Sequence, residues 1–414
     1  MPFRFRPPRI KASRIRLGLR RKGPRKPEIV IGIPSYNEAE NIGTLTQILD
    51  QGLIKYFPDK SAVIVNVDNN SPDNTKKAFL ETKTKTPKHY ISTPPGVGGK
   101  GRNIRNLLEY FLNTESAVAL MTIDADITAA DPKWVKNLLT PIFKGFDHCL
   151  PVYRRSEDDG SITNHLAYPI VRGILGVEIR QPISGQTALS RKAADRIYNR
   201  PWPNGAYGFG IDALMTLSSV FGELKICQSY LGIIHHQPVK LQRPDMFNEV
   251  AATLLGLLNA QKHLWHWSTP MRVRRPPVFF EANLTAEAPK MVVEYRALKE
   301  IAFEEFNKYK KDIGQIVEKN VFDYLVDAFR PGGDFSLDAK RWAAVLICSI
   351  KSSQISHQKR AKFLRPLYLV RLLTFYKESL DKPREKIEEA ILDQATLIFK
   401  ERKKFVEKNH LVEV

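Results

Sequence analysis

Cysteine and long apolar runs are what this sequence has least of. Its 414 residues contain three cysteines, Cys149, Cys227 and Cys348, which are odd in number and widely separated. Such a set provides neither a disulfide framework nor the close ligand spacing of a zinc site. No run approaches the roughly 18 to 20 apolar residues that span a bilayer, and the N-terminus lacks the apolar segment of a secretory signal. These absences lead us to expect a cytoplasmic protein.

Acidic residues are missing from the first 27 residues, which contain eleven Lys and Arg. This tail carries more than half of the net charge of +20. It could bind an anionic membrane surface, which would make the protein peripheral to a membrane, or nucleic acid. A solvated, disordered tail explains it equally well. Elsewhere basic and acidic residues are interspersed without a zinc-finger or RNA-binding signature, so nucleic acid is the weakest of these partners.

Strand-like and helix-like patterns alternate over the first part of the chain. The strand runs occupy residues 28–33, 62–67 and 119–126 with a shorter one near residue 90, and helical spacing occurs in residues 39–53 and 103–111. This alternation predicts an α/β, Rossmann-like domain with a doubly wound, mostly parallel sheet. Ligands of such sheets bind outside the carboxyl ends of the strands.

The second part of the chain has long helical patterns. They are clearest at residues 250–264 and 292–329, and a last helix opens near Pro383, a favourable first-turn proline. Most of these apolar stripes are core, so we expect a helical subdomain or a dimer interface, and a homodimer. The expected organisation is a basic tail (1–27), an α/β domain (28–245) and a helical C-terminal region (246–414).

The strand at residues 119–126 ends on two carboxylates, Asp124 and Asp126, with one residue between them. Side chains alternate along a strand, so the two can point the same way only at or beyond its end. Two like charges repel there unless a cation lies between them, and a hard divalent metal is the usual solution. A lone pair of this kind recurs by chance, so its neighbours decide the interpretation.

Loops at the other strand ends supply those neighbours. Asp68 and Glu38 can accept hydrogen bonds from a nucleobase or ribose, and residues 96–101 offer unhindered backbone amides. Lys100 adds a positive charge, but Gly101 follows it where a P-loop has Ser or Thr. The diphosphate must therefore be held another way, with the acidic pair and its metal as the candidate. Together these loops indicate a site for a nucleoside diphosphate.

The motifs resemble a known family. Pro34-Ser-Tyr-Asn-Glu38, the Asp68 loop and Asp124-Ala-Asp126 resemble the nucleotide half of GT-A glycosyltransferases. Five further motifs resemble the retaining glucosyl-3-phosphoglycerate synthases and mannosylglycerate synthases: Gly99-Lys-Gly, Tyr153-Arg-Arg, Gln181-Pro-Ile-Ser-Gly-Gln-Thr, Tyr207-Gly-Phe-Gly-Ile-Asp212 and Leu231-Gly-Ile-Ile-His-His-Gln-Pro. The resemblance covers residues 28–245, and a helical C-terminal region is also expected in that group.

The resemblance implies a role for each matching position. The divalent metal, Mg²⁺ or Mn²⁺, would be held by Asp126, less directly by Asp124, and by a histidine that the Leu-Gly register puts at His236, with His235 kept as the neighbouring alternative. The donor nucleotide sugar would contact Pro34, Tyr36, Glu38, Asp68, Asn70, Lys100, Asp124, Ala125, Gly185 and Gln186. The acceptor would contact Thr163, Arg155, Tyr207 and Asp212. The catalytic groups would be Lys100 and Asp212.

The implied chemistry is hexose transfer from a GDP-, UDP- or ADP-sugar. The metal and Lys100 would stabilise the charge that develops on the leaving diphosphate. Attack from the same face of the sugar needs no covalent nucleophile, and Asp212 would orient the acceptor. The family's phosphoglycerate-using members grip the acceptor phosphate with an Arg where this chain has Ser161, and Ser cannot replace that cation. We therefore expect glycerate or a related small acid rather than 3-phosphoglycerate, unless Arg154, Arg155, Arg172 or Arg180 serves the phosphate.

Two other interpretations stay open. The loops near Glu38 and Asp68 also resemble polyprenyl-phosphate sugar synthases, in which case the basic tail would dock on an anionic membrane. A non-catalytic protein that binds sugar nucleotides or nucleic acid is the second. It is disfavoured because a complete metal constellation has little use in a pure binder.

Overall fold

The computed structural model describes residues 26–154, 161–234, 244–264, 273–280, 294–330, 332–352 and 354–410. Apart from its last two residues, the basic tail lies outside this set. Within the described residues, no helix combines the length and the apolarity that crossing a bilayer requires.

One mixed sheet forms the base of the molecule, with the strand order β3-β2-β1-β4-β6-β5-β7-β8. Its strands are β1 Ile29–Ser35, β2 Ala62–Asp68, β3 Lys88–Ser92, β4 Ala119–Thr122, β5 His148–Arg154, β6 Thr187–Ser190, β7 Ile226–Ile233 and β8 Val278–Phe279. All pairings are parallel except those of β6, which runs antiparallel to both of its neighbours. The predicted α/β fold with a mostly parallel sheet is confirmed.

Both faces of the sheet are covered, which explains why its strands are apolar throughout. In β1, Ile29, Ile31 and Ile33 contribute to one cluster of buried side chains and Val30 to the other, because side chains alternate along a strand. Helices α1 Ile42–Tyr56, α2 Thr75–Glu81 and α4 Lys133–Phe143 supply the first cluster, and α3 Lys100–Asn113, α6 Arg191–Asn199 and α7 Ile211–Phe221 supply the second.

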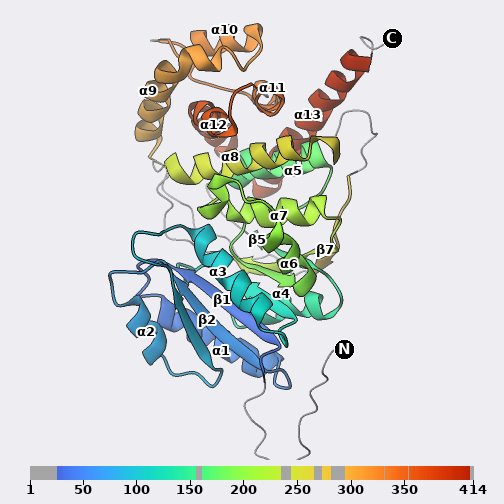
Figure 1. The fold of residues 1–414 in the computed structure, drawn as a ribbon. Coiled ribbons are helices and arrows are strands. Elements are labelled where there is room, and N and C mark those ends of the chain that lie inside the picture. Colours follow the sequence, from blue (N-terminus) through green and yellow to red (C-terminus); the bar gives the residue numbers. More distant parts are fainter. Residues whose placement is uncertain are drawn as a thin grey trace, which may run out of the picture.

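The second cluster continues without a break into the C-terminal helices. These are α8 Pro244–Ala260, η3 Lys262–Leu264, α9 Tyr295–Ile313, α10 Lys319–Ala328, α11 Ala339–Lys351, α12 His357–Ser379 and α13 Arg384–His410. Figure 1 shows the sheet at one end of the molecule and α9 to α12 at the other, with α7 and α8 between them. The helical C-terminal region is therefore confirmed, and it shares a core with the sheet domain.

Two details differ from the sequence prediction. The helical pattern at residues 292–329 forms two helices, because the chain turns at residues 314–318 between α9 and α10. The connection from β5 to β6 contains a π-helical turn, η1 Thr163–Ala167, directly followed by α5 Tyr168–Leu175, and a short 3-10 helix, η2 Asn204–Tyr207, precedes α7. The π-turn is a feature that hydrophobic spacing does not signal.

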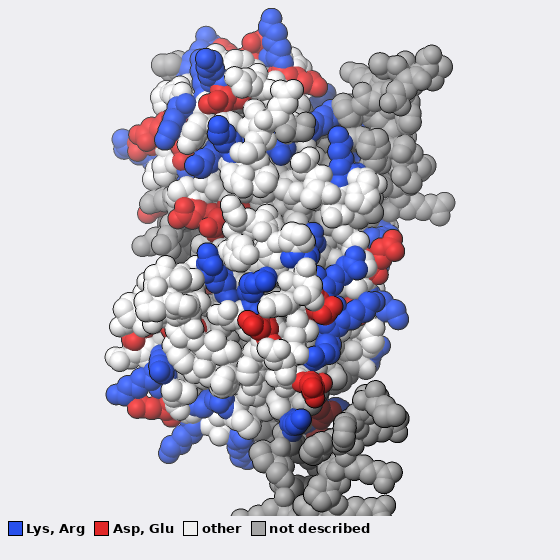
Figure 2. Space-filling view, viewed as in Figure 1, with Lys and Arg blue, Asp and Glu red and all other residues white. Residues whose placement is uncertain are grey.

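Charged side chains are mixed over the visible surface. Figure 2 shows Lys and Arg (blue) spread over the height of the molecule with Asp and Glu (red) among them. This agrees with the interspersed pattern of the sequence outside the tail.

Candidate active site

The acidic pair follows β4, which lies in the middle of the sheet between β1 and β6. The backbone N–H of Ile123 still donates to Gly32 O of β1 at 3.1 Å, so Asp124 lies just beyond the last ladder hydrogen bond. Because β1, β2 and β4 are parallel, their carboxyl ends meet at one edge of the sheet. The loops predicted to bind the donor start from this edge.

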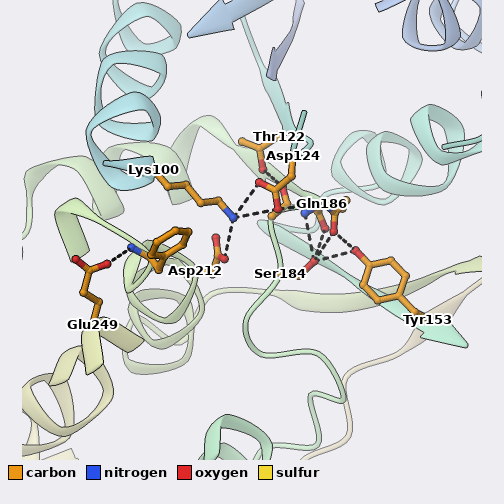
Figure 3. Close-up of polar contacts among 10 residues, drawn as sticks. Lys100, Thr122, Asp124, Tyr153, Ser184, Gln186, Asp212 and Glu249 are labelled. Atoms are coloured by element: carbon orange, nitrogen blue, oxygen red, sulfur yellow. Dashed lines mark hydrogen bonds and ion pairs between the residues drawn. The ribbon is translucent and has the colours of Figure 1, made fainter. Parts of the chain in front are cut away.

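Lys100 connects the acidic pair to α7. Its Nζ lies 2.9 Å from Asp124 Oδ1 and 3.0 Å from Asp212 Oδ2, and Figure 3 shows the ammonium group between the two carboxylates. The three side chains come from the first residue of α3, the loop after β4 and the first turn of α7. Positions far apart in the sequence thus form one charged triangle, and the sequence had assigned all three to the site.

The electrostatics of this triangle follow from its burial. Burial alone would lower the pKa of Lys100, but the carboxylates of Asp124 and Asp212 outweigh it and raise the pKa. Burial raises the pKa of Asp212, and Asp124 adds to the rise while Lys100 opposes it. Burial, then Asp124 and Glu38, raise the pKa of Asp126 to about 6 against the opposing effect of Lys100. The centre therefore holds more negative charge than one lysine neutralises.

One oxygen of Asp212 is left without a partner. Asp212 Oδ2 accepts from Lys100, whereas Oδ1 is buried and accepts no hydrogen bond from any described residue. A buried carboxylate oxygen without a donor is costly, so this atom is the natural acceptor for a hydroxyl group of a bound molecule.

Glycine allows the segment before β6 to approach Asp124 closely. A Cβ at position 185 would lie 2.0 Å from Asp124 Oδ2, which leaves no room for a larger residue. Thr122 Oγ1 donates to Gly185 O at 2.8 Å, and Gln186 Nε2 donates to Asp124 Oδ2 at 3.4 Å. The predicted donor-sugar residues Gly185 and Gln186 therefore lie against the acidic pair.

Gln186 is held in turn by two side chains that sequence analysis did not assign. The Tyr153 hydroxyl donates to Gln186 Oε1 and lies 2.9 Å from Ser184 Oγ, as Figure 3 shows. Tyr153 belongs to a motif that carried the family resemblance, and this was the available signal. Ser184 gave none.

Two glycines let the segment that carries Lys100 pack on η2. A Cβ at position 99 would lie 2.3 Å from Tyr207 O, and one at position 101 would lie 1.8 Å from Ala206 O. Gly99 also has a φ of 126°, which disfavours other residues. The glycines near Lys100 therefore serve close backbone packing as well as the amide exposure that the sequence suggested.

Asp68 is more occupied than the sequence indicated. Its carboxylate accepts hydrogen bonds from Ser35 Oγ (2.9 Å), Ser71 N (2.8 Å), Ser71 Oγ (2.6 Å) and the Tyr90 hydroxyl (2.9 Å), and the residue is fully buried. Tyr90 and the neighbouring Asn70, which has a φ of 53°, line a cavity of about 620 Å³ beside α2. Asp68 thus fixes the loop that presents Asn70.

The first loop places its side chains at the same edge. Pro34 is buried within β1, and Tyr36 is 55% exposed, a large fraction for an aromatic side chain. Glu38 is half-buried, accepts from Asn41 Nδ2 at 2.9 Å and has a pKa raised by burial, then by Asp73 and Asp124. Ala125 is buried between the two acids.

The predicted acceptor residues lie in different parts of the structure. Tyr207 is the last residue of η2, five residues before Asp212, and its ring centroid lies 5.6 Å from that of Trp202. Thr163 opens η1, which packs against α5, α12 and α13, and both Thr163 and Ser161 are buried. Arg155, His235 and His236 lie outside the described residues.

The described residues contain no group of three or more His, Cys, Asp and Glu side chains close enough to hold a metal. The donor set still fits a hard divalent cation. Asp126, Asp124 and Glu38 carry carboxylate oxygens, the donor type that such a cation prefers. Burial, and then repulsion from neighbouring carboxylates, raises the pKa values of Asp126 and Glu38. A divalent cation beside Asp126 would relieve that repulsion.

Comparisons with known proteins agree with the motifs. Residues 75–238 match the family of the mannosylglycerate synthase GT domain. The chain is 28% identical over 144 residues to the mannosylglycerate synthase of Selaginella moellendorffii, covering 33% of this chain and 34% of that protein. It is 27% identical over 188 residues to the dolichol-phosphate mannosyltransferase of Pyrococcus furiosus, covering 42% and 49%. The chain thus spans about a third to a half of the length of these curated relatives.

Among solved structures, the chain is similar to glucosyl-3-phosphoglycerate synthase from Mycobacterium tuberculosis in complex with Mn²⁺, UDP and phosphoglyceric acid. The identity is 24%, the match covers 56% of this chain and 78% of that chain, and the TM-score is 0.46. The family match at residues 75–238 includes Lys100, Asp124, Asp126 and Asp212. The resemblance to GT-A glycosyltransferases of this type is confirmed for that region.

Proposed function

We propose that this protein is a metal-dependent, retaining glycosyltransferase that moves a hexose from a nucleotide-diphosphate sugar to glycerate or a related small acid. The observation that carries the proposal is the triangle of Lys100, Asp124 and Asp212, with Asp212 Oδ1 buried and unpaired among the described residues. A cation beside the acidic pair and a free carboxylate oxygen next to it are what a leaving diphosphate and an attacking hydroxyl require.

Each residue of the triangle has a distinct task in this proposal. Lys100 carries the positive charge that stabilises the developing negative charge on the diphosphate oxygens. Asp212 Oδ1 accepts a hydrogen bond from the acceptor hydroxyl and orients its oxygen toward the anomeric carbon. Asp124 holds Lys100 and lies against Gly185, so the donor sugar would approach backbone rather than side chain.

Asp126, with Asp124 beside it, would hold Mg²⁺ or Mn²⁺, and His235 or His236 remains the proposed further ligand. Such an ion supplies Lewis-acid stabilisation of the diphosphate when bound. The solved relative named above contains Mn²⁺ and UDP, which supports a nucleoside diphosphate and a divalent metal as ligands. The nucleoside would contact Pro34, Tyr36, Glu38 and Asn70, whose loops leave the same edge of the sheet. Asp68 would act indirectly, by holding the loop that presents Asn70.

The proposed acceptor is not phosphorylated. Ser161 is buried and uncharged where a cation would be needed. Two of the arginines that could replace it are engaged elsewhere: Arg172 Nε donates to Glu178 Oε2 at 2.6 Å, and Arg180 donates two hydrogen bonds to Glu388 at 3.0 and 3.1 Å. Because these two arginines are already paired with carboxylates, glycerate matches the site better than 3-phosphoglycerate does.

The test is release of nucleoside diphosphate from a panel of GDP-, UDP- and ADP-hexoses, each with glycerate or 3-phosphoglycerate. Reactions contain Mg²⁺ or Mn²⁺, and parallel reactions contain a chelator. We expect turnover with glycerate that the chelator abolishes. Turnover with 3-phosphoglycerate alone would refute the acceptor assignment. Turnover in the presence of the chelator would refute the metal dependence.

A second candidate function is transfer to a polyprenyl phosphate. It is favoured by the similarity to a dolichol-phosphate mannosyltransferase, which extends over 188 residues. In that case the basic tail of residues 1–27 would bind anionic vesicles, and removal of the tail would abolish both pelleting and transfer. Retained glycerate activity in the truncated chain would exclude it. We propose further that residues 28–245 form the transferase domain, and that residues 246–414 form a helical region used in a homodimer, which sedimentation velocity tests.

A further inference from the structure

A carboxylate from the helical region reaches the loop that carries Asp212. Glu249 lies on α8, beyond residue 238 where the family match ends. Its Oε2 accepts a hydrogen bond from the backbone N–H of Phe209 at 2.8 Å, three residues before Asp212. Figure 3 shows Glu249 and its hydrogen bond to one side of the Lys100, Asp124 and Asp212 side chains. Nothing in the sequence pattern of α8 distinguishes Glu249 from a surface acid.

The segment 204–210 lies directly on α8 through positions without side chains. A Cβ at position 208 would lie 2.2 Å from Glu249 Oε2, and one at position 210 would lie 2.1 Å from Thr253 Oγ1. A Cβ at position 205 would lie 2.6 Å from Glu249 O. The glycines therefore bring the backbone of this segment against one face of α8. The hydrogen bond from Phe209 N–H to the Glu249 carboxylate fixes the distance between the segment and the helix.

The opposite side of the same segment supports Lys100. Gly101 N donates to Gly208 O at 3.1 Å, and the backbone at positions 99 and 101 packs on the carbonyl oxygens of Tyr207 and Ala206. The segment 204–210 is therefore a layer between α8 and the start of α3, and Asp212 follows it at once. A shift of this layer would move Asp212 and Lys100 relative to each other.

We propose that Glu249 is a positioning residue that sets the separation of Lys100 and Asp212 through the backbone of Phe209. The proposal rests on the proposed function, because it assigns the helical region a part in building the transfer site. A hydrogen bond from a backbone N–H to a carboxylate is stronger than one to a neutral oxygen, and the half-buried setting of Glu249 protects it from competition by water. Burial and, to a smaller extent, Asp245 raise the pKa of Glu249, and the Phe209 N–H opposes this rise, so the hydrogen bond favours the ionised acceptor.

Three variants test the proposal. Glu249→Ala removes the acceptor of the Phe209 N–H, and Glu249→Gln keeps an oxygen in its place. Asp245→Ala is the matched control, because Asp245 is an exposed acid one turn earlier on the same helix. Each full-length variant is assayed for kcat and donor KM, and its amide hydrogen exchange is followed in peptides that cover residues 204–212.

We expect Glu249→Ala to lower kcat by about 10- to 100-fold with little change in donor KM, since a displacement near 1 Å has effects of that size. Exchange at residues 204–212 should accelerate in the same variant. Glu249→Gln should recover most of the kcat, and Asp245→Ala should match the wild type in both measurements. Unchanged exchange in Glu249→Ala, or equal losses in Glu249→Ala and Asp245→Ala, would overturn the proposal.

A fourth variant perturbs the same contact without replacing Glu249, which protects the test against a folding defect of Glu249→Ala. Gly208→Ala pushes its new Cβ against Glu249 Oε2 and leaves Glu249 itself in place, so it should reproduce the loss of kcat and the faster exchange. A normal kcat in Gly208→Ala would count against the proposal. If the wild type transfers hexose to none of the acceptors, the proposed function fails, whereas the exchange measurement still decides whether Glu249 holds this segment.

Discussion

Replacing Lys100 by methionine removes the central charge and keeps most of the side-chain volume. Its Nζ lies 2.9 and 3.0 Å from two carboxylates, and the Lys100 side chain is 16% exposed. At an effective dielectric constant of about 20, each such contact corresponds to roughly 5 kcal/mol of attraction, which burial of the charges largely offsets. Removing one partner of a buried pair leaves only the cost, typically about 3–5 kcal/mol.

Lys100→Met should lose more activity than its lower stability alone would cause. Loss of one charge-stabilising group from a preorganised site lowers kcat by about 10²–10³-fold. The matched control is Lys60→Met, because Lys60 pairs with Glu28 at 2.7 Å while both side chains are a third or more exposed. An exposed pair contributes at most about 1 kcal/mol, so this variant should keep its activity and nearly all of its stability.

The pH dependence of Lys100→Met separates charge from packing. Without the lysine, burial and the Asp124 carboxylate raise the pKa of Asp212 further in the folded state. A folded-state pKa raised above the unfolded value means that the folded protein binds protons more tightly, so the stability lost at neutral pH returns as the pH falls. Urea unfolding at about pH 8 and about pH 5 should therefore give a smaller difference from wild type at the lower pH. An equal difference at both, or a kcat within about tenfold of wild type, would refute this reasoning.

Three further predictions concern the acidic pair after β4 and the proposed acceptor site. Gly185→Ala places a Cβ 2.0 Å from Asp124 Oδ2, so it should lower kcat by about 100-fold while the melting temperature falls by only a few degrees. Asp126→Asn should raise the stability of the metal-free protein at neutral pH by about 1–3 kcal/mol, because the pKa of Asp126 is raised to about 6 and its charge opposes folding. This gain should vanish below about pH 4, where the Asp126 carboxyl is protonated in both states. Calorimetry of the same variant should detect no binding of Mn²⁺. Ser161→Arg should shift acceptor preference toward 3-phosphoglycerate, measured as the ratio of kcat/KM for the two acids.

The sequence was sufficient for the parallel strands β1 to β4 and for the acids that follow β4, whereas β5 to β8 and the antiparallel direction of β6 were not predicted. Alternating strand and helix patterns predicted a parallel sheet, and that topology brings the ends of β1, β2 and β4 together without any further information. The D-x-D pair predicted a cation between like charges. In the structure, Lys100 neutralises Asp124, and Asp126 retains the unbalanced charge. The structure brings Lys100, Asp124 and Asp212 together, and their pairing depends on how α3 packs.

Other features could not be read from the sequence because they arise from contacts between distant segments. Asp68 stood out as a ligand for the nucleoside, yet Ser35 of β1 and Tyr90 of β3 occupy its oxygens together with Ser71 of its own loop. Glu249 lies in a helix whose periodicity indicates only core and surface. Its role depends on the glycines of the segment 204–210, which come into contact with α8 only after the chain has folded.

The most direct test of the central claim is the structure of the product. The enzyme is incubated with the donor that supports turnover and with glycerate in the presence of Mn²⁺, and the anomeric configuration of the product is determined by NMR. The account predicts a hexosylglycerate with the anomeric configuration of the donor, formed by the wild type and lost in Lys100→Met and in Asp212→Asn. A product with inverted configuration, or undiminished formation in either variant, would contradict it.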